Sequence, residues 1–230
     1  MDHIDERRMT PCPIPAPPKL VIFDCDGVLV DSEPVTDGVI ARNLARHGMT
    51  ISEERVHALF VGGTMQGVMD TVRAQGTPLP NTWLDEIYSE MFAALAKGVP
   101  VYDGVMALLD GLDRADIPFA IASNGPMRKM ETTLKPSGLW DRFAGRIYSG
   151  HDYTPKPSPD MLHHACQVAG VAVLDAVFID DSPTGCKAAQ NAGMGCLGFR
   201  PEGETDVLAA TGAAPVRSMD AVMDLLAIAR

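Results

Sequence analysis

The chain has 230 residues, of which 46% are hydrophobic and 21% are charged, and its formal net charge is −11. This composition argues against general disorder, and the acidic balance argues against a broad attraction to nucleic acid or to an anionic membrane. No uninterrupted apolar stretch is long enough to cross a bilayer, so we expect no membrane partner. An anionic substrate would need a cation close to its binding site.

The cysteines and the first residues indicate the compartment. The five cysteines form no CxxC pair, which argues against structural zinc and against a disulfide scaffold and favours a cytoplasmic protein. Residues 1–18 hold charges followed by PCPIPAPP and contain no apolar region of the kind found in signal peptides. We therefore predict a flexible N-terminal tail over 1–18.

The first regular element is a short buried strand at 21–23, where β-branched and aromatic residues are bounded by Asp and Gly. The later segments that run in the same way from apolar into small or polar residues are 117–125, 146–150, 175–182 and, more weakly, 195–199. The helical patterns that lie between or after them are 104–115, 159–169 and 183–192. Strands that alternate with helices predict a Rossmann-like α/β fold with a doubly wound parallel sheet.

The segment 34–101 breaks this alternation, because it offers helical stretches separated by Gly and Pro and no convincing strand. Those stretches are 35–47, 52–60, 64–75 and 81–97. We predict that 34–101 is an inserted α-helical cap and that 19–33 and 102–230 form the catalytic core. Open α/β sheets bind ligands at the carboxyl ends of their strands, so an insertion after the first strand is a candidate lid.

Two carboxylates follow the first strand in the sequence FDCDG. Asp24 and Asp26 project to the same side because strand side chains alternate, and Gly27 allows the backbone to turn sharply. One carboxylate could act as a nucleophile that forms an aspartyl-phosphate while the other transfers protons. Taken alone, Asp-x-Asp-Gly is also common in simple turns.

A second acidic pair, Asp180 and Asp181, ends the strand predicted at 175–182. Adjacent carboxylates repel each other unless a cation neutralises them, and Mg²⁺ matches hard oxygen ligands better than zinc does. Taken alone, Asp181 or Ser182 could instead cap the helix that begins near Pro183.

Two further clusters could bind phosphate. Ser123, Asn124 and Gly125 follow the second strand and offer a hydroxyl, an amide and unobstructed backbone N–H groups just before a helix. A plain turn would explain them equally well. Lys156 lies between two prolines that restrict its backbone, so it could neutralise both phosphate and nucleophile. A single lysine is more often solvated surface.

The order of these four clusters favours a shared site. They follow the carboxyl ends of successive strands of one predicted parallel sheet, so we expect them to converge. Four independent turns would explain each cluster separately, but they would not explain this order.

On these residues the chain resembles the haloacid dehalogenase superfamily, in its phosphatase branch with an α-helical cap, over residues 19–200. The motifs that carry the resemblance are FDCDGVLVDSE, IASNG, KPSPD and IDDSPTG. The resemblance implies that Asp24 is the nucleophile and Asp26 the acid and base, while Ser123 and Lys156 support the phosphate.

The resemblance also implies a magnesium ion. Its ligands would be the Asp24 carboxylate, the main-chain oxygen of Asp26 and the acidic pair, with Asp181 bound directly and Asp180 through water. Asp26 favours phosphate transfer, because true haloacid dehalogenases lack a second aspartate.

The choice of substrate depends on finer likenesses. SNGPMRKM, SGHDYTPKPSPDML and DDSPTG are similar to segments of 6-phosphogluconate phosphatases. In LFVGGTMQGV, where β-phosphoglucomutases present an arginine, the chain has Met65, which weakens the interpretation as a mutase. We expect a Mg²⁺-dependent phosphomonoester hydrolase whose partner is a small phosphorylated metabolite, a sugar phosphate or phosphosugar acid. A phosphomutase and a non-catalytic phosphate-binding module stay as alternatives, and the sequence does not indicate an oligomeric state.

Overall fold

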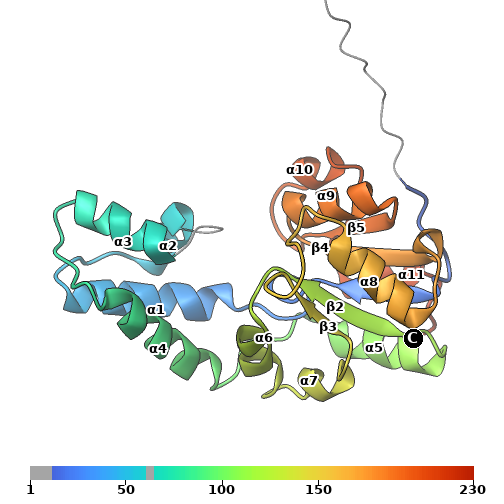
Figure 1. Ribbon diagram of the computed structural model, residues 1–230, viewed down its shortest axis with the longest axis horizontal. Helices are drawn as coiled ribbons and strands as arrows, with labels where there is room; N and C mark the ends of the chain where they lie inside the picture. Colours follow the sequence, from blue (N-terminus) through green and yellow to red (C-terminus); the bar gives the residue numbers. More distant parts are fainter. Residues whose placement is uncertain (1–11, 61–64) are drawn as a thin grey trace, which may run out of the picture. The chain divides into compact units, whose positions relative to one another are not determined.

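The structure is a computed structural model that describes residues 12–60 and 65–230 (Figure 1). The chain divides into two compact units. The first contains the described chain up to Leu29 together with Tyr102–Met127 and Phe143–Arg230, and the second contains Val30–Val101 and Arg128–Arg142. We describe each unit by itself.

The first unit is built on a six-stranded sheet in the order β3-β2-β1-β4-β5-β6, and every neighbouring pair is parallel. The strands are β1 (Leu20–Phe23), β2 (Phe119–Ser123), β3 (Ile147–Ser149), β4 (Ala176–Asp180), β5 (Gly195–Phe199) and β6 (Ala214–Val216). The strands β2 and β3 follow β1 on one side of the sheet, and β4, β5 and β6 follow it on the other. The switch in strand order therefore lies between β1 and β4. The predicted Rossmann-like, doubly wound parallel sheet is confirmed, and ligands of such sheets bind beside this switch.

Side chains of β1 alternate between two apolar layers, as a strand covered on both faces requires. Leu20 and Ile22 belong to one buried cluster together with residues of α8 (Asp160–Ala169) and α9 (Pro183–Ala192). On the other face, the rings of Phe23 and Phe119 lie 6.0 and 5.0 Å from the ring of Phe143. The remaining helical elements of this unit are α5 (Val105–Arg114), η1 (Val173–Asp175), α10 (Asp206–Ala209) and α11 (Met219–Leu225).

Two features of this unit did not follow from the sequence. The short strand β6 contains Pro215, which cannot donate to a ladder and is tolerated because β6 is an edge strand. Part of the predicted tail packs on the sheet: a Cβ atom at Gly195 would lie 2.6 Å from the main-chain oxygen of Pro13. Residues 1–11 of that tail lie outside the described residues.

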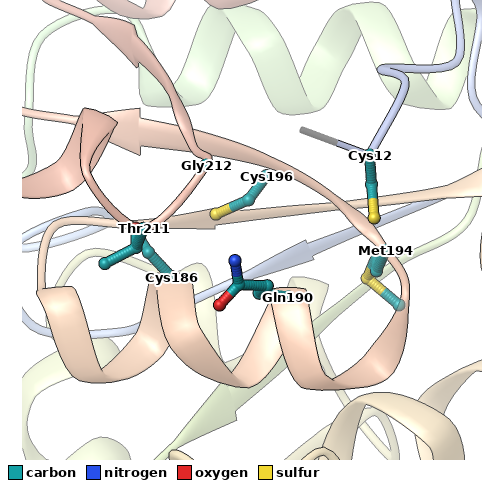
Figure 2. Close-up of a pocket in the computed structure, with 7 residues that line it drawn as sticks. All are labelled: Cys12, Cys186, Gln190, Met194, Cys196, Thr211 and Gly212. Carbon is teal, nitrogen blue, oxygen red and sulfur yellow. The ribbon is translucent and has the colours of Figure 1, made fainter. Parts of the chain in front are cut away.

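Figure 2 shows a hollow beside this N-terminal segment, with the Cys12 side chain pointing toward Met194. Its lining residues are Cys12, Cys186, Gln190, Met194, Cys196, Thr211 and Gly212. None of the residues that the sequence predicts for the functional site is among them, although Cys186 Sγ lies 4.0 Å from the main-chain oxygen of Asp180.

The second unit is helical. Its helices are α1 (Glu33–Arg46), α2 (Glu53–Phe60), α3 (Met65–Ala74), α4 (Trp83–Leu95), α7 (Leu139–Arg142) and α6 (Met127–Leu134), whose first residue still belongs to the first unit. The core between α1, α2, α3 and α4 is formed by buried side chains such as Leu44, Val56, Val72 and Trp83. The helices α1 to α4 match the predicted helical stretches within two residues at each described end. By contacts, this unit also includes residues 128–142, which the sequence division assigned to the core.

Candidate active site

The candidate site lies at the carboxyl edge of the sheet in the first unit. Asp24 directly follows β1, and Ser123 and Asp180 are the last residues of β2 and β4. Lys156 lies in the loop between β3 and α8. Because all these strands are parallel, their ends share one edge, and side chains from four segments far apart in sequence reach it.

Lys156 holds this cluster together. Its Nζ donates to Asp24 Oδ1 at 2.8 Å and to Asp180 Oδ2 at 2.7 Å, and only 4% of its side chain is exposed. Burial lowers the pKa of Lys156, but the charges of Asp180 and Asp24 outweigh this effect and raise the pKa above its ordinary value. The lysine is therefore a buried cation and not a solvated surface residue.

The Asp180 carboxylate is bound at both of its oxygens. Oδ2 accepts from Lys156, while Oδ1 accepts from the backbone N–H and the hydroxyl of Ser182 at 2.8 and 2.7 Å. The packing is tight, because a Cβ atom at Gly185 would lie 1.8 Å from Asp180 Oδ2. Asp180 thus orients Lys156 from a fixed position.

The helix cap considered for the second acidic pair is present too, and it is made by Ser182. Its hydroxyl accepts from the N–H of Gly185 at 3.0 Å in the first turn of α9. A serine cap and an acidic cluster therefore coexist at this helix start, and Asp181 does not make the cap.

Three carboxylates converge beside the lysine. Asp24, Asp180 and Asp181 each offer an oxygen, and these atoms lie within 4.8 Å of one another. Gly27, at φ 84°, leaves room for this arrangement, since a Cβ atom there would lie 2.3 Å from Asp181 Oδ2.

The electrostatics show an excess of negative charge. Burial, assisted by the charges of Asp180 and Asp24, raises the pKa of Asp181 to about 8. Burial also raises the pKa of Asp24 to about 6, although Lys156 opposes the shift. One lysine does not compensate three clustered carboxylates, and a hard divalent cation fits this set of oxygen donors.

Asp26 is half-buried, and its charge is one of those that raise the pKa of Asp24. Among the described residues, the carboxylates that gather closely enough to share an ion come from Asp24, Asp180 and Asp181. This leaves the Asp26 carboxyl group outside the cluster, and metal binding by the main-chain oxygen of Asp26 stays a prediction.

The predicted phosphate-binding turn follows β2 directly. Ser123 Oγ accepts from the N–H of Gly125 at 3.2 Å. The hydroxyl of Ser149, at the end of β3, donates to the carbonyl of Gly125 at 2.7 Å and so holds the turn. The side chain of Asn124 bonds to the main chain of Lys156 through both of its polar atoms.

Sequence reasoning missed two residues that shape this site, namely Ser149 and Gly185, and it considered Ser182 only as a helix cap and not as a partner of Asp180. A signal existed for Ser182, because Ser-Pro-x-Gly after a strand is typical of a capped helix start. No local pattern marks Ser149, whose contact is made across two neighbouring strands.

Comparison with known proteins identifies the family. The family model of haloacid dehalogenase-like hydrolases matches residues 18–193. The chain belongs to this hydrolase family. It is 30% identical over 177 residues to the 6-phosphogluconate phosphatase of Escherichia coli (strain K12), a match that covers 76% of this chain and 79% of the relative.

Solved structures agree with the family. A HAD family hydrolase from Deinococcus radiodurans with bound phosphate and sodium matches with a TM-score of 0.80 and 30% identity, over 93% of this chain and 98% of that chain. A putative β-phosphoglucomutase from Thermotoga maritima shares the fold, with a TM-score of 0.78 and 23% identity over 91% and 97% of the two chains. The predicted membership of the superfamily and the predicted HAD-like phosphatase enzyme are confirmed.

This haloacid dehalogenase-like hydrolase has no described helix that is both long and apolar enough to cross a membrane. Its clustered groups comprise a buried carboxylate, a buried ammonium group and a set of oxygen donors for a cation. Such a set suits transfer of an anionic group to a carboxylate. The role of each residue in the reaction stays a prediction.

Proposed function

We propose that the chain is a Mg²⁺-dependent phosphomonoester hydrolase of a small sugar phosphate or phosphosugar acid. Its reaction passes through an aspartyl-phosphate on Asp24. The observation that carries this proposal is the buried Asp24 carboxylate, held at 2.8 Å by Lys156 beside the acidic pair Asp180 and Asp181.

In the first half of the reaction, Asp24 attacks phosphorus. Lys156 binds Asp24 Oδ1, which leaves Oδ2 outside that contact and available to form the new P–O bond. The bond between phosphorus and the sugar oxygen breaks as this bond forms, and Asp26 donates a proton to the departing oxygen. Lys156 offsets the repulsion between an anionic nucleophile and an anionic substrate.

In the second half, Asp26 takes a proton from a water molecule, and the resulting hydroxide attacks phosphorus. The bond between phosphorus and Asp24 breaks, which releases inorganic phosphate and restores the carboxylate. The Ser123 hydroxyl and the backbone N–H of Asn124 bind the non-bridging oxygens during both halves, while the N–H of Gly125 donates to Ser123 Oγ and so orients that hydroxyl.

The metal would be held by the carboxylates of Asp24 and Asp181 and by the main-chain oxygen of Asp26. Asp180 would lie beside the metal without binding it directly, since both Asp180 oxygens are already bound to Lys156 and Ser182. When bound, Mg²⁺ supplies positive charge that offsets the charge of the phosphoryl group. The raised pKa values of Asp24 and Asp181 support a cation at this position.

The substrate class rests on the relatives. The chain is similar to a protein named 6-phosphogluconate phosphatase, and a solved relative contains phosphate. A cytoplasmic location stays a prediction from the spacing of the cysteines in the sequence. The residues that separate a mutase from a phosphatase lie partly in 61–64, outside the described residues, and Met65 begins α3.

A phosphate-release screen tests the proposal. Purified protein is incubated with sugar phosphates, phosphosugar acids and nucleotides, with and without Mg²⁺, and Asp24→Asn serves as the matched control. Release of one inorganic phosphate per substrate by the original chain alone is the expected result.

Other outcomes point elsewhere. Interconversion of hexose phosphates that needs a bisphosphate activator and releases little phosphate would identify a phosphomutase. Hydrolysis of no monoester would favour a non-catalytic phosphate-binding module.

A further inference from the structure

We propose that Asn124 is a positioning residue, whose side chain fixes the main chain of Lys156 and does not bind the substrate. This inference rests on the proposed function only in that Lys156 takes part in phosphoryl transfer. It replaces the sequence-based prediction that Asn124 binds substrate through its amide, and it leaves the backbone N–H of Asn124 for phosphate.

The contact is bidentate. Asn124 Oδ1 accepts from the N–H of Lys156 at 2.7 Å, and Asn124 Nδ2 donates to the carbonyl of Lys156 at 3.1 Å. Both polar atoms of the amide are therefore engaged by one residue that lies 32 positions further along the chain. A primary amide carries two N–H donors and an oxygen with two lone pairs, so this arrangement engages one donor and one lone pair.

Lys156 needs such an anchor because it lies in a loop and not in a helix or strand. The flanking prolines Pro155 and Pro157 restrict the local dihedral angles, but they do not fix where the loop lies relative to the sheet. The two hydrogen bonds between the Asn124 side chain and the Lys156 main chain, which we call the Asn124 clamp, link the loop to the end of β2. From this base the lysine ammonium reaches Asp24 and Asp180 at 2.8 and 2.7 Å.

Packing around the clamp is close on the side of Gly150. A Cβ atom at Gly150 would lie 3.0 Å from Asn124 Oδ1, 3.1 Å from Asn124 Cα and 3.2 Å from Pro155 Cβ. The N–H of Gly150 also donates to the carbonyl of Ser123 at 2.8 Å. The absence of a side chain at Gly150 thus allows the turn after β2 and the lysine loop to approach each other.

Asn191 offers a matched control, because its side chain bonds to Pro157, the residue that follows Lys156. Asn191 Nδ2 donates to the carbonyl of Pro157 at 2.9 Å, so Asn191→Ala removes a similar side-chain bond to the same loop. Among the described residues, the side-chain hydrogen bond of Asn191 goes to the carbonyl of Pro157 and not to the main chain of Lys156. Its loss should change turnover less than about threefold.

The first experiment is a double-mutant cycle of Asn124→Ala and Lys156→Ala, measured with an aryl phosphate whose leaving group needs no proton. We expect Asn124→Ala to lower kcat about 100-fold with KM changed less than about threefold, because a misplaced catalytic group costs about that factor. In the Lys156→Ala background, the same substitution should cost less than about twofold. A raised KM at unchanged kcat would show direct substrate binding, and an equal loss in both backgrounds would show that Asn124 acts independently of Lys156. Either result would overturn the proposal.

The second experiment does not depend on activity. Amide hydrogen exchange at Lys156 should accelerate in Asn124→Ala and not in Asn191→Ala, because the first substitution removes the acceptor of that N–H. Unchanged exchange at Lys156 would overturn the inference. If the original chain hydrolyses no phosphate monoester, the proposed function fails. The exchange rate at Lys156 still tests whether Asn124 fixes the main chain of Lys156.

Gly150→Ala provides a second route if Asn124→Ala does not fold. Its methyl group would press on the Asn124 amide without removing it. We expect a loss of kcat in the same direction and faster exchange at Lys156, with KM nearly unchanged. Original values for kcat and for exchange would contradict the clamp.

Discussion

Two polar networks join elements that are far apart in the chain, and they differ in the balance of their charges. At the carboxyl edge of the sheet, Asp24, Asp180 and Asp181 gather around one lysine. The pKa of Asp24 rises to about 6 and that of Asp181 to about 8, with burial as the main cause in both cases. Ionising these carboxylates opposes folding while no metal ion accompanies them, because Lys156 alone does not balance their charge.

The network of the helical unit is different. Glu86 on α4 accepts from Asn43 Nδ2 at 2.8 Å and lies 3.1 Å from His47 Nε2 on the α1 side. Arg46 lies 3.6 Å from Glu86 and also pairs with Glu90. The pKa of Glu86 is lowered, first by its hydrogen bond to His47, so its charge is stabilised by its neighbours.

The contrast distinguishes a functional cluster from a structural one. Charges that are paired at a partly exposed surface link α1 and α4, and they need no additional ligand or ion to balance them. Buried carboxylates in excess over their cations are unfavourable on their own and indicate a site that is completed by a ligand or a metal. Four predictions test this distinction.

The largest effect is expected for Asp24→Asn. An amide cannot act as the carboxylate nucleophile, so phosphate release should fall at least about 10⁴-fold while the fold stays intact. Steady-state phosphate release measures the loss. The same chemical change in the other network, Glu86→Gln, should leave turnover within about twofold, and full activity of Asp24→Asn would refute the mechanism.

Removal of the metal should come next. EDTA should abolish activity, Mg²⁺ should restore it, and Ca²⁺ should restore little, because Ca²⁺ takes more ligands at longer range and could engage both oxygens of Asp24. Asp181→Ala should lower turnover about 100-fold and weaken the response to Mg²⁺, as judged from Mg²⁺ titrations of phosphate release.

The control for Asp181→Ala is Asp175→Asn, which alters an exposed carboxylate paired with Lys19 at 2.9 Å. It should titrate with Mg²⁺ like the original chain. If Asp181→Ala did so too, Asp181 would not be a metal ligand.

Stability should depend on pH in the metal-free protein. Asp24 and Asp181 have folded-state pKa values above their ordinary value of 3.8, so their contribution to stability is present below pH 4 and is lost as pH rises through about 6 and 8. In EDTA, Tm should therefore fall between pH 5 and pH 9. Mg²⁺ should raise Tm more at pH 9 than at pH 5, because it binds the ionised carboxylates.

Asp181→Asn sharpens this test because it removes the group with the higher of the two pKa values. The decrease of Tm with pH in EDTA should become shallower in this variant. A gain in Tm from Mg²⁺ that is the same at every pH would contradict a cation site built from raised-pKa carboxylates.

The smallest effect is expected in the helical network. The fully buried Asn43 accepts from Trp83 Nε1 at 2.7 Å, so Asn43→Ala leaves a buried indole N–H without its partner. The free energy of unfolding, from urea denaturation, should fall by about 1–3 kcal/mol. Arg46→Ala, at a partly exposed ion pair, should cost less than about 1 kcal/mol. A changed response of activity to Mg²⁺ in either variant would contradict the separation of the helical network from the metal site.

Local patterning was sufficient to predict much of this molecule. Short apolar runs that end in Asp24, Ser123 and Asp180 predicted buried parallel strands, and parallel strands share one carboxyl edge, so the convergence of these residues followed from topology. Helical periodicity located α1 to α4 because each helix packs an apolar stripe that repeats along its own sequence. These are properties of segments about 5 to 17 residues long, and the sequence displays them directly.

Other features required long-range contacts. Asn124 has the same local signals whether its amide meets a phosphate or the main chain of Lys156, and only the approach of two loops 32 residues apart selects the second partner. The packing of Pro13 on Gly195 and the bonding of both Asp180 oxygens depend in the same way on which segments the folded sheet brings together. Side-chain hydrogen bonds are directional and reach about 3 Å, so their partners are chosen by the fold and not by neighbouring residues in the chain.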